Sequence, residues 1–237
     1  MKARFLDRFE VILLDLGHTF MFDCDKFSEQ EDFWATYVRL GGGRLGFEQI
    51  REVLLNLYSF VCQCYSDPVL FERFPNMKEM MARCAAVKEF ARNEGKLIEE
   101  VFAAHEIGTV TPEYADVLSM LRRTHRLGLV SNTWSDSKWY LDEFERAGIR
   151  GLFETIIFSS DHGCIKPSPR LFENAISVFN VDRAKIVFVG DSYKRDIGGA
   201  KGVGISAVWI QNDRHPIPPE GPRPDLVIRD LKELLRV

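Results

Sequence analysis

Polar side chains suited to phosphate chemistry recur in this chain directly after short apolar runs. Two aspartates, a serine and a lysine each follow such a run, and a third aspartate lies five residues beyond the second: Asp15, Ser131, Lys166, Asp191 and Asp196. Carboxylate oxygens are the preferred ligands of Mg²⁺, and a lysine supplies a point charge for a phosphoryl oxygen. A hydroxyl and free backbone amides bind further oxygens, and an activated carboxylate can attack phosphorus. Brought together, these groups would perform phosphoryl transfer.

Each of these residues also has an ordinary structural explanation. Asp15 could end a strand, Ser131 could cap a helix, Lys166 could be solvated, and Asp191 could shape a turn. What makes the set specific is its order, because each residue follows a predicted strand or the loop after one.

The elements that must position these residues alternate between strands and helices. Short apolar runs predict six strands, at residues 11–14, 127–131, 155–159, 186–190, 205–210 and 226–228. Helical periodicity separates most of them, and Thr111-Pro112 and Ser168-Pro169 are typical helix starts. Alternation of this kind predicts an α/β fold with a doubly wound, Rossmann-like parallel sheet. The carboxyl ends of parallel strands share one edge, where ligands bind in such sheets.

A long segment between the first and second strands follows a different pattern. From about residue 28 to residue 105, apolar residues recur at i, i+3 and i+4 in four stripes, which predict helices. One stripe contains Leu57, Tyr58 and Val61, and we expect all four stripes to pack between helices. The sequence therefore predicts an α/β core domain at residues 1–24 and 106–237, with an inserted helical domain at residues 25–105.

Composition excludes several classes of partner. Hydrophobic residues make up 46% and charged residues 28%, and the formal net charge is −4. This balance gives no electrostatic footprint for nucleic acid, and no apolar run reaches the 18 residues that a membrane span needs. The first residues lack a signal-peptide core, and five cysteines form no disulfide framework. We therefore expect a cytoplasmic protein that contacts neither nucleic acid nor a membrane, and the oligomeric state stays open.

Four motifs in order resemble those of the haloacid dehalogenase-like hydrolases, across nearly the whole chain. The family's Asp-x-Asp-Gly-Thr is matched by Asp15-Leu16-Gly17-His18-Thr19, and its strand-terminal Ser or Thr by Ser131. Its lysine is matched by Lys166, and its Gly-Asp-x-x-x-x-Asp by Gly190-Asp191 with Asp196. The helical insert is similar to the family's all-helical (C1-type) cap.

The resemblance implies a Mg²⁺-dependent phosphatase of a small phosphorylated metabolite. Asp15 would be the nucleophile, and the cap would close over the cleft. The implied Mg²⁺ ligands are Asp15, the Gly17 carbonyl, Asp191 and Asp196. The implied phosphoryl-binding residues are Ser131, Asn132 and Lys166, with Lys166 also counted as catalytic.

Gly17 departs from the family pattern, because most of its phosphatases carry an acid/base aspartate there. Asp23, Asp25 and His18 are the nearby residues that could replace it, although His18 is expected to shape a turn. The phosphatase would then be slow, or restricted to good leaving groups. A non-catalytic metal- and phosphate-binding protein is the alternative. A C-halogen hydrolase is a further alternative. Such enzymes usually need no metal, so the intact pair of Asp191 and Asp196 argues against it.

Overall fold

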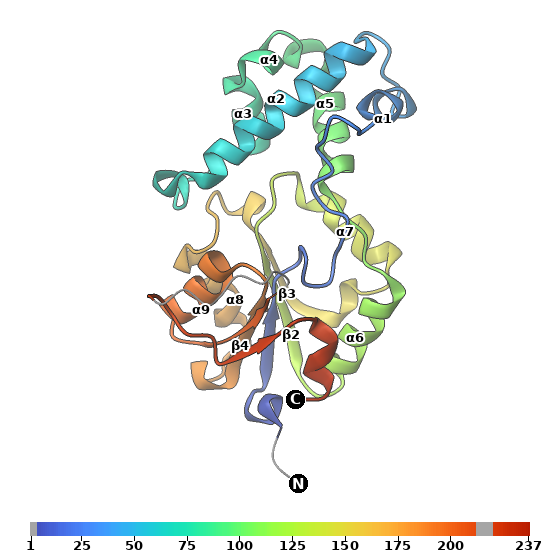
Figure 1. Ribbon diagram of the computed structural model, residues 1–237. Coiled ribbons are helices and arrows are strands. Elements are labelled where there is room, and N and C mark those ends of the chain that lie inside the picture. Colours follow the sequence, from blue (N-terminus) through green and yellow to red (C-terminus); the bar gives the residue numbers. More distant parts are fainter. Residues whose placement is uncertain (1–3, 212–219) are drawn as a thin grey trace.

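The protein is built around one parallel β-sheet, which the computed structural model describes for residues 4–211 and 220–237 (Figure 1). Within these residues the sheet has six strands in the order β3-β2-β1-β4-β5-β6, and every neighbouring pair is parallel. The strands are β1 (Val11–Leu14), β2 (Arg126–Ser131), β3 (Phe153–Phe158), β4 (Ile186–Gly190), β5 (Ser206–Ile210) and β6 (Leu226–Ile228). The predicted doubly wound fold is confirmed, with each strand within two residues of its predicted bounds.

Strand β1 is apolar throughout because helices cover both faces of the sheet. Ile12 and Leu14 belong to one hydrophobic cluster, while Val11 and Leu13 belong to another on the opposite face. The first cluster includes residues of α6 (Pro112–Arg122) and α7 (Ser137–Arg146). The second includes residues of α8 (Pro169–Phe179) and α9 (Gly198–Gly202). A continuous apolar run is the pattern expected of a strand buried in this way.

The strand order reverses between β1 and β4, which lie side by side at the centre of the sheet. β2 and β3 extend to one side, and β5 and β6 to the other. In open α/β sheets a crevice forms outside the carboxyl ends of the strands at this reversal. Asp15 and Asp191 directly follow β1 and β4, so the topology brings both to this crevice.

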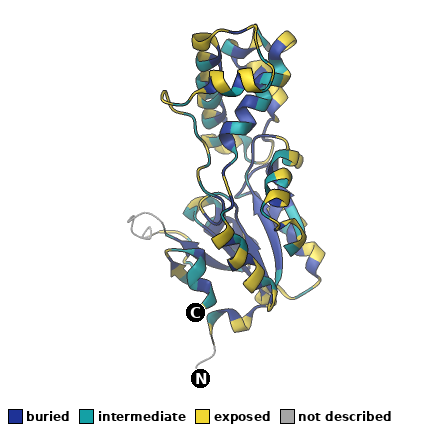
Figure 2. Cartoon of the chain, turned by 90° about the vertical axis from the view of Figure 1, so that its right-hand side faces the viewer, coloured by how far each residue is buried: buried dark blue, intermediate teal, exposed yellow. Residues whose placement is uncertain are grey.

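The segment between β1 and α6 is largely helical, as predicted, and its helices lie beyond the carboxyl ends of the strands (Figure 1). Its helices are α1 (Phe33–Arg39), α2 (Phe47–Ser66), α3 (Met77–Arg83), α4 (Ala85–Lys88) and α5 (Ala91–Glu106). Their apolar stripes form a hydrophobic cluster of their own, to which the sheet side contributes Trp134 and Ile165. Figure 2 shows the exposed residues on the outer surfaces of these helices. The exact domain boundaries stay predictions.

Two connecting segments join the helices to the sheet and are hydrogen-bonded to each other. Phe22 and Thr109 form an antiparallel bridge. The Asp25 amide donates to the carbonyl of Glu106 at 3.0 Å, and the Lys26 amide donates to the carbonyl of His105. The two connectors therefore run side by side above the sheet edge. No helix in the described part of the chain is long and apolar enough to cross a membrane.

Candidate active site

A buried lysine lies between two carboxylates at the end of β1. The Lys166 Nζ is 2.5 Å from an Asp15 oxygen and 2.6 Å from an Asp196 oxygen, and only 2% of the Lys166 side chain is exposed. These charges raise the pKa of Lys166 against the opposing effect of burial. The lysine is therefore a fixed positive charge beside the Asp15 carboxylate.

Asp191 completes a group of three carboxyl groups in this crevice. Oxygens of Asp15, Asp191 and Asp196 lie within 4.8 Å of one another, the one such candidate metal-binding group among the described residues. No side chain described in the structure forms an ion pair or hydrogen bond with the Asp191 carboxylate. Burial, followed by the charges of Asp15 and Asp196, raises its pKa to about 8. Three carboxyl groups that share the single ammonium of Lys166 fit a divalent cation with oxygen ligands.

The same repulsion makes the stability of the metal-free site depend on pH. Burial raises the pKa of Asp196 to about 6, with Lys166 opposing the shift. An acid whose pKa is raised on folding keeps a proton that the unfolded chain has already released. The free energy of unfolding therefore falls as pH rises from about 4 to about 8, through the range set by Asp191 and Asp196.

The predicted phosphoryl-binding residues follow β2 and meet Lys166. The Asn132 side-chain oxygen accepts from the backbone amide of Lys166 at 2.8 Å, while its Nδ2 donates to the Tyr65 hydroxyl at 2.9 Å. Ser131 is 2% exposed, with its hydroxyl 3.3 Å from the Asn132 carbonyl. One cavity of about 410 Å³ is lined by all seven predicted site residues: Asp15, Gly17, Ser131, Asn132, Lys166, Asp191 and Asp196. The structure thus brings the whole set together, and the role of each residue stays a prediction.

Gly17 leaves open space in this cavity. A Cβ placed on Gly17 would meet no other atom within 4 Å, and its φ lies outside the left-handed region that favours glycine. Of the residues that could replace the missing acid, His18 and Asp25 line the cavity and Asp23 does not. The φ values are 53° for His18, 55° for Asp25 and 57° for Asp23. Nothing in the backbone therefore requires glycine at position 17.

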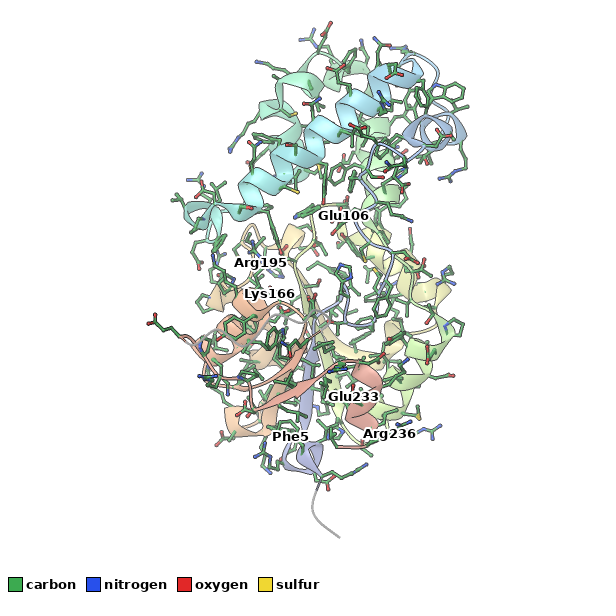
Figure 3. The ribbon with its side chains drawn as sticks, in the orientation of Figure 1. Phe5, Glu106, Lys166, Arg195, Glu233 and Arg236 are labelled. Carbon is green, nitrogen blue, oxygen red and sulfur yellow. The ribbon has the colours of Figure 1, made fainter. Side chains whose placement is uncertain are left out.

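Arg195, which the sequence analysis did not single out, joins the α2 helix to the lysine loop. It lies on the π-helical turn Tyr193–Ile197. Its guanidinium donates to the Lys166 carbonyl at 2.6 Å and to the Tyr65 carbonyl at 2.5 Å. The same guanidinium lies 3.5 Å from the centroid of the Tyr65 ring. Figure 3 shows Arg195 close to Lys166, between the helices and the sheet.

Glu106 organises the loop after β2 and was also missed by the sequence analysis. Its carboxylate accepts from the backbone amides of Trp134 at 2.8 Å and Ser135 at 2.9 Å, and from the hydroxyl of Tyr140. Burial raises the pKa of Glu106, while these hydrogen bonds oppose the shift. The residue lies where the helical segment rejoins the sheet (Figure 3).

Tyr58 packs against the helical cluster, as predicted, and it also lines the cavity, which the sequence analysis did not predict. Leu57 and Val61 are fully buried in the helical segment, as expected. Tyr58 lies one position further round α2, on a second stripe with Cys62 and Tyr65 at i, i+4 and i+7. This spacing was visible in the sequence, but only the structure shows what the stripe faces.

Comparison with known proteins places the chain in a family. The profile of the haloacid dehalogenase-like hydrolases matches residues 30–204, most of the chain. The protein therefore belongs to the haloacid dehalogenase-like hydrolases, as the four motifs predicted.

Individual relatives have different activities. The chain is 32% identical over 142 residues to the pyrimidine 5′-nucleotidase YjjG from Escherichia coli, covering 59% of this chain and 62% of the relative. It is 31% identical over 158 residues to a phosphoserine phosphatase from Thermus thermophilus, covering 66% and 61%. It thus spans about three fifths of each relative's length. A 2-haloacid dehalogenase from Pseudomonas syringae has the same fold, with a TM-score of 0.66, 22% identity and 96% coverage of both chains.

Proposed function

We propose that this hydrolase is a Mg²⁺-dependent phosphatase that acts on a small phosphorylated metabolite through an aspartyl phosphate on Asp15. The observation that supports it most directly is the Asp15 carboxylate, held 2.5 Å from the Lys166 ammonium beside two further aspartates. Phosphatases among the relatives support the same reaction type. Residues 25–105 would be the cap that closes the cavity and excludes water.

Each group then has a defined part in the reaction. Mg²⁺ would be held by Asp15, Asp191, Asp196 and the Gly17 carbonyl, and would neutralise charge on the phosphoryl oxygens. Asp15 attacks phosphorus, and the electron pair of the breaking P–O bond leaves on the ester oxygen. Lys166, Ser131 and the Asn132 backbone hold the phosphoryl oxygens during this transfer. Water then attacks the aspartyl phosphate, which releases phosphate and restores Asp15.

A panel of phosphate esters with and without Mg²⁺ tests this proposal. We expect Mg²⁺-dependent release of phosphate, which Asp15→Asn abolishes. Asp116→Asn, an exposed position on α6, is the matched control and should leave the rate unchanged. If no ester yields phosphate at any Mg²⁺ concentration, a non-catalytic metal- and phosphate-binding role replaces the proposal.

Glycine at position 17 is also compatible with a second candidate function, that of a C-halogen hydrolase. A halide ion leaves carbon without a proton, so a C-halogen hydrolase needs no acid at position 17. The Asp191 carboxylate has no ion pair or hydrogen bond with any side chain that the structure describes, and this favours a metal-dependent reaction instead. Chloride release from 2-chloropropionate without Mg²⁺ would decide for the dehalogenase.

A further inference from the structure

The part of the cavity formed by the helices and connectors offers an aromatic wall. Tyr58 and Tyr65 come from α2, and Trp134 comes from the loop after β2. The Trp134 ring meets the Tyr58 and Tyr65 rings edge-on, with centroids 5.9 Å and 5.6 Å apart. Rings of this kind are a favourable surface for a planar group of a ligand.

One ring of this wall extends an existing stack. Phe27 and Tyr58 are parallel, with centroids 4.3 Å apart and an interplanar angle of 12°. Tyr58 lines the cavity whereas Phe27 does not. Phe27 itself packs against Phe33 and Phe102 in the helical segment, which fixes its position. A flat ring bound in the cavity would continue the stack from Tyr58.

A carboxylate, that of Asp25, lines the cavity together with this wall. No described residue forms a hydrogen bond or ion pair with the Asp25 side chain, which is open to the cavity. Surrounding protein and the neighbouring Glu106 raise the pKa of Asp25 to about 7. Burial raises the pKa values of Tyr58 and Cys62, with a smaller contribution from the Asp25 charge, and all three residues line the cavity.

Glu106 is a less available acceptor than Asp25, since only 5% of Glu106 is exposed. Its two oxygens are already occupied by the Trp134 and Ser135 amides and the Tyr140 hydroxyl. Asp25, in contrast, is exposed, and no described residue donates a hydrogen bond to its carboxylate. A ligand with a positive charge or an N–H group would supply that donor, while an anionic group would be repelled.

We propose that this part of the cavity binds the leaving group of the substrate, and that it selects a flat ring carrying a protonated amine, with the ring on Tyr58 and the amine at Asp25. The proposal rests on the proposed phosphatase function and names the substrate class for it. Phosphate monoesters of aromatic amines are then preferred over neutral, anionic or purely aliphatic esters.

Matched pairs of esters test the proposal. The first pair is 4-(aminomethyl)phenyl phosphate and 4-ethylphenyl phosphate, which differ in charge but not in shape. The second is 4-ethylphenyl phosphate and butyl phosphate, which differ in the ring and also in the leaving group, so only the change that a Tyr58 variant makes in their ratio reports on the ring. With Mg²⁺ at pH 8, we expect kcat/KM to favour the amine by about 2- to 5-fold, the usual effect of an ion pair with an exposed carboxylate.

Two variants test whether Asp25 causes the preference for the amine and Tyr58 the preference for the ring. Asp25→Asn should bring the amine-to-ethyl ratio close to one, and Tyr58→Leu should lower the aryl-to-alkyl ratio. The control is Asp23→Asn, since Asp23 has nearly the same φ as Asp25 but does not line the cavity. Asparagine tolerates this backbone region, so neither Asp→Asn change should disturb the fold. An amine-to-ethyl ratio of one in the wild type, or a ratio that Asp25→Asn leaves unchanged, would overturn the proposal.

Calorimetry with the Asp15→Asn variant separates this inference from the proposed function. It measures binding of the same esters without turnover. Tighter binding of the amine ester that is lost in Asp15→Asn/Asp25→Asn supports the inference, even if the wild type hydrolyses no ester. Hydrolysis of all esters, with equal binding of the charged and neutral pair, contradicts the inference and leaves the phosphatase function standing.

Discussion

Gly17 is the position where one substitution should change the chemistry most. A Cβ there meets nothing within 4 Å, and the backbone angle is open to any residue. An aspartate therefore fits, and loss of glycine flexibility in the unfolded chain contributes about 0.4–1 kcal/mol of stability. The added charge near three other carboxyl groups opposes this gain. We expect Gly17→Asp to fold with a melting temperature close to that of the wild type.

The kinetic effect should be large and should depend on the leaving group. A positioned acid or base contributes roughly 10²–10⁴ in rate. An alkoxide leaves poorly without a proton, whereas a phenolate leaves without help. Gly17→Asp should therefore speed hydrolysis of an alkyl phosphate by about 10²–10⁴, and of an aryl phosphate much less.

Rapid-mixing kinetics with an aryl phosphate provide the assay. In the wild type, water must attack the Asp15 phosphate unaided, so we expect a burst of phenol followed by slow turnover. Mass spectrometry after an acid quench should detect phosphorylated Asp15, and Gly17→Asp should abolish the burst. Gly17→Asn is the control, because it has the same shape but cannot exchange a proton.

Two results would refute this reasoning. One is a wild type that hydrolyses alkyl and aryl phosphates at the same rate without a phosphoenzyme. Another residue would then supply the proton, and His18 and Asp25 would be the first to replace, because both line the cavity. The other is a Gly17→Asp variant that behaves like Gly17→Asn, which would show that a carboxyl group at this position does not reach the reacting atoms.

Three further predictions concern the metal site and its supports. The melting temperature of the metal-free protein should fall from pH 5 to pH 8 as Asp196 and Asp191 ionise, and Mg²⁺ should restore it except in Asp191→Asn. Arg195→Lys should lower kcat/KM by about tenfold, because a lysine cannot donate to two carbonyls in fixed directions; circular dichroism checks that the fold persists. Glu106→Gln should cost about 1–3 kcal/mol, measured by urea unfolding, because an amide cannot accept every hydrogen bond that the carboxylate does.

Most of the fold was predictable because its signals are local. The four apolar residues of β1 already imply helices on both faces of the sheet. The polar residue after each strand then implies a shared edge. Asp15, Ser131 and Asp191 could be brought together on paper because parallel strands all end on the same side.

The residues that the sequence did not predict depend on how distant segments meet. Arg195 acts through backbone carbonyls of Lys166 and Tyr65, and carbonyls have no sequence signature. Glu106 continues the helical pattern of α5, and only its contacts with the loop after β2 distinguish it. Tyr58 packs against the helical cluster as predicted, but its contact with the cavity depends on how α2 lies over the sheet edge. In each case, the function of the side chain depends on a segment that is distant in the sequence and contacts it only in the folded protein.

The protonation state of Asp191 distinguishes the two enzymatic functions, a C-halogen hydrolase and a Mg²⁺-dependent phosphatase. Lys166 neutralises Asp15 and Asp196 through direct contacts, and no cationic side chain in the described part of the chain forms an ion pair with Asp191. A C-halogen hydrolase without metal would have to keep this carboxyl protonated, which its pKa of about 8 allows below that pH. Such an enzyme would lose stability as pH rises from about 4 to about 8, whether or not Mg²⁺ is present. A Mg²⁺-dependent phosphatase would show the opposite, with stabilisation by Mg²⁺ that grows as pH rises and the carboxylate becomes available.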